Sequence, residues 1–133
     1  MLTLKRLAYY SKATQDFDSS DLISLAAEAA RFNALDGITG VLFYSDGRFA
    51  QIFEGVDEAA HELLARLERD KRHTDIQILI EEEVDGSIFT SWDMRLMKEN
   101  ETNSAVVSRM VNSQTLPNNI ADFIDNFAAR MDA

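Results

Sequence analysis

The pattern of hydrophobic and polar residues along the chain changes between two periods. Five runs are strand-like: one alternates with a period of two, and the others are recognised by β-forming residues or by flanking turn signals. These runs span residues 3–11, 37–44, 47–55, 74–84 and 88–98. Apolar residues at a spacing of three and four, which is typical of helices, follow the first strand and the third. The predicted order is therefore β-α-β-β-α-β-β.

This order predicts an α+β fold of the ferredoxin-like type, with both helices packed on one face of a single sheet. The sequence Ser-Asp-Gly at residues 45–47 is typical of a hairpin turn between the second and third strands. The first helix is expected to begin at an N-cap, either Ser19 or Ser20. The second helix is expected over about residues 57–70.

Two amides lie on faces that are otherwise apolar. The first helix has an apolar stripe made of Leu22, Leu25, Ala26 and Ala29. Four residues beyond Ala29, on the same face, lies Asn33. In the third strand, Gln51 lies between Phe49 and Phe53 on one face. Burying an amide without a partner costs about 1–3 kcal/mol, so both positions predict a polar partner.

The last third of the chain has a different character. Two amphipathic helices are expected at residues 103–114 and 117–131, and Pro117 is suited to open the second. The second has an apolar stripe of Ile120, Phe123, Ile124, Phe127 and Met131. We expect residues 1–98 to form one domain and residues 99–133 a two-helix extension that packs on it. An alternative use of this hairpin is a surface for a partner or for dimerisation.

Composition narrows the class of protein. A chain of 133 residues is long enough for one domain with its own core. The net charge is −10, from 23 acidic and 13 basic residues, which disfavours binding to nucleic acid. The absence of cysteine excludes disulfides, thiolate metal sites and cysteine nucleophiles. We find no leader and no run of about 20 apolar residues, so we expect a cytoplasmic protein without a membrane span.

The familiar catalytic motifs are missing. His61-Glu62 begins like a zinc-protease motif, but Ala65 stands where the second histidine is needed. The sequence has no Walker loop, no dinucleotide-binding glycine motif and no nucleophile elbow. One alternative from the enzyme class is a small enzyme that uses Asp70 and His73 as an acid–base pair. We expect a protein that is not an enzyme and has no metal site.

Several polar residues in apolar surroundings point instead to a bound ligand. They are Tyr9, Asn33, Gln51 and the pair Trp92 and Met94. Singly, each is explained by ordinary packing or capping. Together, a phenol and two amides between helices and a sheet suit the polar edge of a flat heteroaromatic ligand. Phosphates on such a ligand would need the basic residues Arg31, Lys71 or Arg72.

The same residues resemble the BLUF family, the blue-light sensors that use FAD. The likeness covers about residues 3–98 and includes, in the family's order, RLAYYS, RFNALDGITGVLFY, GRFAQIFEG, RDKRHTDI and FTSWDM. The series of Tyr9, Asn33, Gln51, Asp70-x-Arg72-His73 and Trp92-x-Met94 is specific to the family. Two residues depart from the family pattern. Phe53 stands where the family usually has leucine, and Ser87 stands where it often has arginine. Both concern packing or the rim of the site.

The resemblance implies that the flavin ring of FAD lies between the first two helices; FMN or riboflavin would also fit, because recognition is concentrated on the ring. The implied photocycle residues are Tyr9, which Ser11 follows at the family's spacing, and Gln51, which lies between Tyr9 and the flavin. The implied cofactor-binding residues are Tyr9, Leu25, Ala29, Arg31, Asn33, Phe49, Gln51, Asp70, Arg72 and His73. The implied relay residues are Trp92 and Met94, on the strand beside Gln51, together with Ser11; family members differ over whether Trp92 or Met94 packs against the glutamine.

The resemblance also implies a mechanism. Blue light excites the flavin, Tyr9 gives up an electron and then a proton, and Gln51 rotates or tautomerises. The hydrogen bond to the flavin C4 carbonyl becomes stronger, and the change passes to the C-terminal hairpin. We expect the output to be a change in homo-oligomeric assembly or in binding to a downstream protein. The alternative is a ferredoxin-like domain that binds another small aromatic ligand without photochemistry.

Overall fold

The computed structural model describes residues 3–111 and 115–130 of the chain. The elements are β1 Leu4–Ala13, α1 Ser19–Asp36, β2 Thr39–Ser45, β3 Arg48–Val56, α2 Asp57–Arg69, β4 His73–Val84, β5 Arg95–Met97, a 3-10 turn η1 Glu99–Glu101, α3 Ser104–Met110 and α4 Asn118–Arg130. The strands form one sheet in the order β4-β1-β3-β2-β5. All neighbouring strands are antiparallel except β2 and β5, which are parallel.

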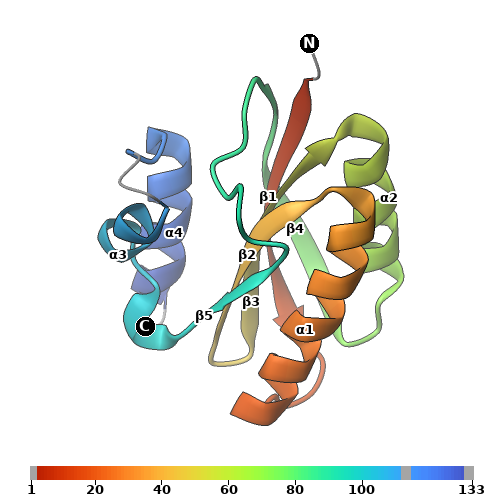
Figure 1. Ribbon diagram of the computed structural model, residues 1–133. Helices are drawn as coiled ribbons and strands as arrows, with labels where there is room; N and C mark the ends of the chain where they lie inside the picture. Colours follow the sequence, from red (N-terminus) through yellow and green to blue (C-terminus); the bar gives the residue numbers. More distant parts are fainter. Residues whose placement is uncertain (1–2, 112–114, 131–133) are drawn as a thin grey trace.

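Helices cover both faces of the sheet. Figure 1 shows α1 and α2 on one side and α3 and α4 on the other. The predicted α+β fold, with two helices on one face and a C-terminal helical hairpin, is confirmed. In the part of the chain that the structure describes, every helix falls short of the length and apolar character needed to cross a membrane.

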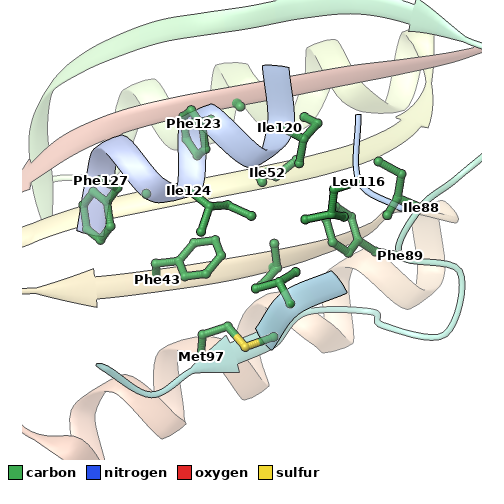
Figure 2. Close-up of a cluster of buried hydrophobic side chains, with 14 of the residues drawn as sticks. Phe43, Ile52, Ile88, Phe89, Met97, Leu116, Ile120, Phe123, Ile124 and Phe127 are labelled. Atoms are coloured by element: carbon green, nitrogen blue, oxygen red, sulfur yellow. The ribbon is translucent and has the colours of Figure 1, made fainter. Parts of the chain in front are cut away.

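The α4 side of the sheet holds the largest apolar cluster. Figure 2 shows residues of α4 against side chains of the central strands. Phe43 from β2 and Ile52 from β3 are fully buried there, together with Ile120 and Ile124 from α4. The expected stripe of the last helix therefore packs on the sheet, and Met131 lies outside the described residues. The alternation along β3 turns Ile52 to this side and Gln51 to the other.

Local capping and turn chemistry explain how the first helix and the hairpin are bounded. The predicted N-cap at Ser19 or Ser20 is wrong, because the cap is Asp18. The Asp18 carboxylate accepts the Asp21 backbone N–H at 2.8 Å, and the Asp21 carboxylate accepts the Asp18 N–H at 3.0 Å. In the β2–β3 hairpin, Asp46 and Gly47 have φ angles of 50° and 78°, as a type I′ turn requires.

The predicted strand at residues 88–98 is largely wrong, because only Arg95–Met97 joins the sheet. The preceding segment is held by the buried carboxylate of Glu54, which accepts backbone N–H groups from Ile88 at 3.1 Å and Phe89 at 3.2 Å. It also accepts the Ser87 hydroxyl at 2.7 Å. Since these donors are bound to a side chain, they are not available for a strand ladder.

Candidate functional site

A pocket of about 330 Å³ opens between helices α1 and α2 and the sheet. Its lining residues are Tyr9, Leu25, Glu28, Ala29, Phe32, Asn33, Leu42, Phe49, Gln51, Leu63, Arg66, Leu67, Asp70, Arg72 and His73. Most of the wall is apolar and the few polar groups converge from the strands and both helices, which is the usual composition of a small-molecule site.

The pocket brings together all the predicted cofactor-binding residues except Arg31, which is exposed on α1. The prediction missed Glu28, Phe32, Leu42, Leu63, Arg66 and Leu67 as lining residues. Helical spacing could have found most of them. Glu28 and Phe32 follow Leu25 and Ala29 by three residues, and Arg66 lies one turn before Asp70.

The floor of the pocket is formed by the pair Tyr9 and Gln51. They are direct neighbours across strands β1 and β3, and the Tyr9 hydroxyl donates a hydrogen bond to Gln51 Oε1. Their side chains are nearly inaccessible, since Tyr9 is 3% and Gln51 4% exposed. Burial, with a smaller effect from the negative charge of Asp70, raises the pKa of the Tyr9 hydroxyl. Tyr9 therefore keeps its proton and presents it to the amide.

Met94, and not Trp92, contacts this pair. The Gln51 Nε2 donates to the Met94 sulfur at 3.8 Å, and Met94 packs with Leu42 and Phe49 on the pocket side. Trp92 stacks on Phe89 at 5.6 Å and packs against the cluster on the α4 side. The expectation that both lie on a strand beside Gln51 is wrong, because β5 begins at Arg95. They precede β5 in an irregular segment, where the period of two does not apply.

Two polar atoms of the pocket walls lack a hydrogen-bond partner among the described residues. Asn33 is 1% exposed; its Nδ2 donates to the Asp93 carbonyl at 2.7 Å, but its Oδ1 is buried and unbonded. Arg66 Nη2 is also buried and unbonded, 3.6 Å from Asp36. The unbonded buried acceptor of Asn33 costs about 1–3 kcal/mol. The Arg66 side chain is 37% exposed and keeps the Asp36 carboxylate as a countercharge. A ligand N–H would satisfy the Asn33 oxygen, and a ligand carbonyl would accept from Arg66.

Ionic contacts close another edge of the pocket. Arg72 lies between two carboxylates, with Nη2 2.6 Å from Asp70 and Nη1 3.1 Å from Glu28 of α1. The hydrogen bond from Arg72 is the main cause that lowers the pKa of Asp70, and the same bond raises the pKa of Arg72. Both groups therefore stay charged at neutral pH and link α1 to the segment before β4.

Both ring nitrogens of His73 are occupied. Nε2 lies 2.7 Å from the Leu67 carbonyl, which can only accept, so Nε2 carries a proton. Nδ1 lies 2.8 Å from the Ser11 hydroxyl, which donates to it when the ring is neutral. Because both nitrogens are bound within the protein, His73 is poorly suited to exchange protons with a substrate. This geometry weighs against an acid–base pair of Asp70 and His73.

Comparisons with known proteins indicate the family of the chain. The BLUF family, described as sensors of blue light using FAD, matches residues 4–95. Photoactivated adenylate cyclase subunit beta of Euglena gracilis is 40% identical over 74 residues, which are 56% of this chain and only 9% of that protein.

Solved structures give the same result over a greater length. The dark-state structure of the BLUF protein BlrB is similar with a TM-score of 0.75 at 27% identity, and the match covers 98% of each chain. Klebsiella pneumoniae BlrP1, solved with FMN and cyclic diGMP, has a TM-score of 0.79 at 26% identity, covering 95% of this chain and 34% of that one. The chain therefore belongs to the BLUF family of flavin-based blue-light sensors.

Proposed function

We propose that the chain binds FAD in the pocket between α1 and α2 and reports blue light through the hydrogen bond between Tyr9 and Gln51. The observation that supports this best is a phenol and an amide bonded to each other at the floor of an apolar pocket, each less than 5% exposed. Both groups are neutral, so they can exchange donor and acceptor roles without burying a new charge.

The residues present fit a flavin ring. Asn33 Oδ1 would accept the ring N–H of the pyrimidine portion, and Arg66 would donate to a carbonyl beside it. These two contacts would satisfy the two unbonded buried atoms of the pocket. Arg31 and Lys71 are exposed, as residues that contact phosphates outside the pocket must be. Since the contacts in the pocket involve the ring alone, FMN or riboflavin would bind in the same way.

The bound flavin would supply the absorption of blue light and an excited state that accepts an electron. Tyr9 would donate that electron, and the proton of its hydroxyl would move toward Gln51 Oε1, the atom it already contacts. Rotation or tautomerisation of the Gln51 amide would then exchange an acceptor for a donor at the pocket surface. Rotation would also withdraw Nε2 from the Met94 sulfur, 3.8 Å away.

Met94 is suited to pass this change on. It directly precedes β5, which pairs with β2 and leads into η1 and α3. Ser11, bonded to His73 on the pocket side, would serve as a second relay, and Trp92 would respond through the α4-side cluster. The output would be a change in homo-oligomeric assembly or in binding to a downstream protein. The adenylate cyclase activity named for the Euglena relative belongs to a protein of which this chain matches 9%.

An absorption spectrum before and after blue light tests this function. We expect a flavin spectrum that shifts to the red under light and returns in darkness. A flavin spectrum that does not respond to light would contradict the photochemistry. Absence of flavin, even after FAD is added to the purified protein, would contradict the cofactor and favour the ferredoxin-like domain with another aromatic ligand.

The variant Asn33→Leu should weaken flavin binding by about 10- to 100-fold, because a ring N–H would be buried without its acceptor. Fluorescence titration of the apoprotein with riboflavin and with FAD measures this loss. The control is Leu35→Ala on the same helix, since Leu35 is 85% exposed and does not line the pocket. Equal affinity of Asn33→Leu and the wild-type protein would remove Asn33 from the site.

The variant Gln51→Leu should keep its fold and its flavin but lose the red shift. Leucine fills a similar volume and cannot exchange donor for acceptor at the pocket floor. The light-minus-dark difference spectrum measures the effect. Gln77→Leu is the control, because Gln77 is exposed on β4. A normal red shift in Gln51→Leu would show that the amide is not the switching group.

A further inference from the structure

A groove on the α4 side of the sheet lies outside the flavin site. It runs between the edge strand β4 and helix α4, and it is lined by Tyr10, Leu79, Ile80, Asn119, Asp122, Phe123 and Asn126. Strand β4 has a neighbour on one side only, because it ends the sheet order. The groove therefore lies where α4 covers the inner strands and leaves the edge strand open.

A β-bulge makes the floor of this groove apolar. The register between β1 and β4 shifts at Leu79: Ala8 pairs with Ile80 and Tyr9 pairs with Ile78. The extra residue brings both Leu79 and Ile80 to the groove, although strict alternation would separate them. Leu79 is 52% exposed at the edge of the sheet. The floor thus offers an apolar contact that nothing in the described chain covers.

The residues of α4 that line the groove are spaced as on a surface that binds another helix. Asn119, Asp122 and Asn126 lie three and four residues apart, so they form one polar row along the groove. An apolar floor beside a polar helical row matches the apolar face and one flank of an amphipathic helix. Such a helix would lie alongside α4 and rest on Leu79.

Charge indicates what kind of helix fits. Asp122 is exposed and forms no ion pair among the described residues, whereas Glu82 at the end of the row contacts Asn119 at 3.1 Å and is paired with Arg6 at 3.0 Å. The whole chain has a net charge of −10. A second copy of the chain would place like charges against each other here. A partner with basic residues beside its apolar face would be attracted.

We propose that this groove docks an amphipathic, basic helix of a partner protein. The groove is also well connected to the flavin site. Tyr10 follows Tyr9 in β1 but faces the opposite side, where its hydroxyl donates to the Phe123 carbonyl at 2.6 Å and its ring stacks on Phe123 at 4.6 Å. This contact therefore links β1, next to Tyr9, to α4. Docking itself does not depend on flavin, whereas its modulation by light rests on the proposed function.

The test uses two synthetic helical peptides of about 15 residues with the same leucine stripe, one with lysines and one with glutamates on the polar face. NMR titration of the full chain in the dark should show binding of the lysine peptide alone. The largest shifts are expected at Leu79, Ile80, Asp122 and Phe123. The variants Leu79→Ser and Asp122→Lys should each weaken binding about tenfold or more.

Two matched variants on the other face serve as controls. Leu35→Ser and Glu62→Lys change an exposed leucine of α1 and an exposed glutamate of α2 in the same way, and both should bind the lysine peptide normally. Equal weakening by Glu62→Lys and Asp122→Lys would indicate attraction by net charge alone and overturn the proposal. Failure of the lysine peptide to bind would overturn it too. Loss of self-association in Leu79→Ser would assign the groove to a second copy instead.

Discussion

Replacing Tyr9 with phenylalanine is expected to abolish the light response while the protein stays folded and binds flavin. The substitution removes one hydroxyl and keeps the ring, which packs in the pocket-side cluster and lies 6.0 Å from the His73 ring. The Gln51 carbonyl loses its donor, so we expect a loss of stability of about 1–3 kcal/mol. Phenylalanine has no proton to give and is a much poorer electron donor than a phenol. The light-minus-dark spectrum should therefore be flat.

Tyr10→Phe is the matched control for this prediction. It removes the hydroxyl of the next residue in the same strand, but that hydroxyl bonds to Phe123 on the opposite face. Its spectral cycle should be retained. A normal cycle in Tyr9→Phe would show that the electron donor is another residue. Loss of the cycle in both variants would mean that disturbance of β1, and not the lost phenol, causes the effect.

The second large effect is expected from Glu54→Gln, which should lower the free energy of unfolding by about 3–5 kcal/mol. The Glu54 carboxylate is 1% exposed and lies 2.8 Å from the Arg6 Nε, and Arg6 is 4% exposed. The substitution removes one of the two countercharges of a buried arginine, whose Nη1 also lies 3.0 Å from Glu82. It also turns one acceptor oxygen into a donor that faces the N–H groups of Ile88 and Phe89. Urea unfolding at neutral pH measures the loss.

Glu83→Gln on β4 is the control, because Glu83 is exposed and its side chain has no hydrogen bond or ion pair among the described residues. It should change stability by less than about 0.5 kcal/mol. If Glu54→Gln also stays within that range, the carboxylate does not hold the segment before β5. A spectral change in Glu54→Gln, at temperatures where it remains folded, would connect this segment and Met94 to the flavin environment.

Local patterns in the sequence were enough to predict the order of the elements. Alternation and helical spacing are properties of neighbouring residues, so they indicate which runs form strands and helices. The hairpin at Asp46 and Gly47 was predicted for the same reason, since positive φ angles favour these residue types. The amides Asn33 and Gln51 could be identified because a buried polar group in an apolar stripe requires a partner.

Other features depend on contacts between residues far apart in the chain, and only the tertiary structure decided them. The segment before β5 is irregular because its donors bind Glu54, more than 30 residues earlier. In the same irregular segment Trp92 and Met94 pack into clusters on opposite sides of the sheet, although they are two residues apart. Arg66 enters the pocket through the packing of α2, whereas Arg31 stays outside it.

The sequence by itself therefore determined the fold class, the family and the pair Tyr9 and Gln51, since these follow from local periodicity and from a specific series of residues. The tertiary structure decided which neighbour Gln51 contacts, which polar atoms of the pocket lack a partner and where a groove remains beside α4. The physical reason is that hydrogen-bond satisfaction and exposure depend on what the rest of the folded chain brings to each atom.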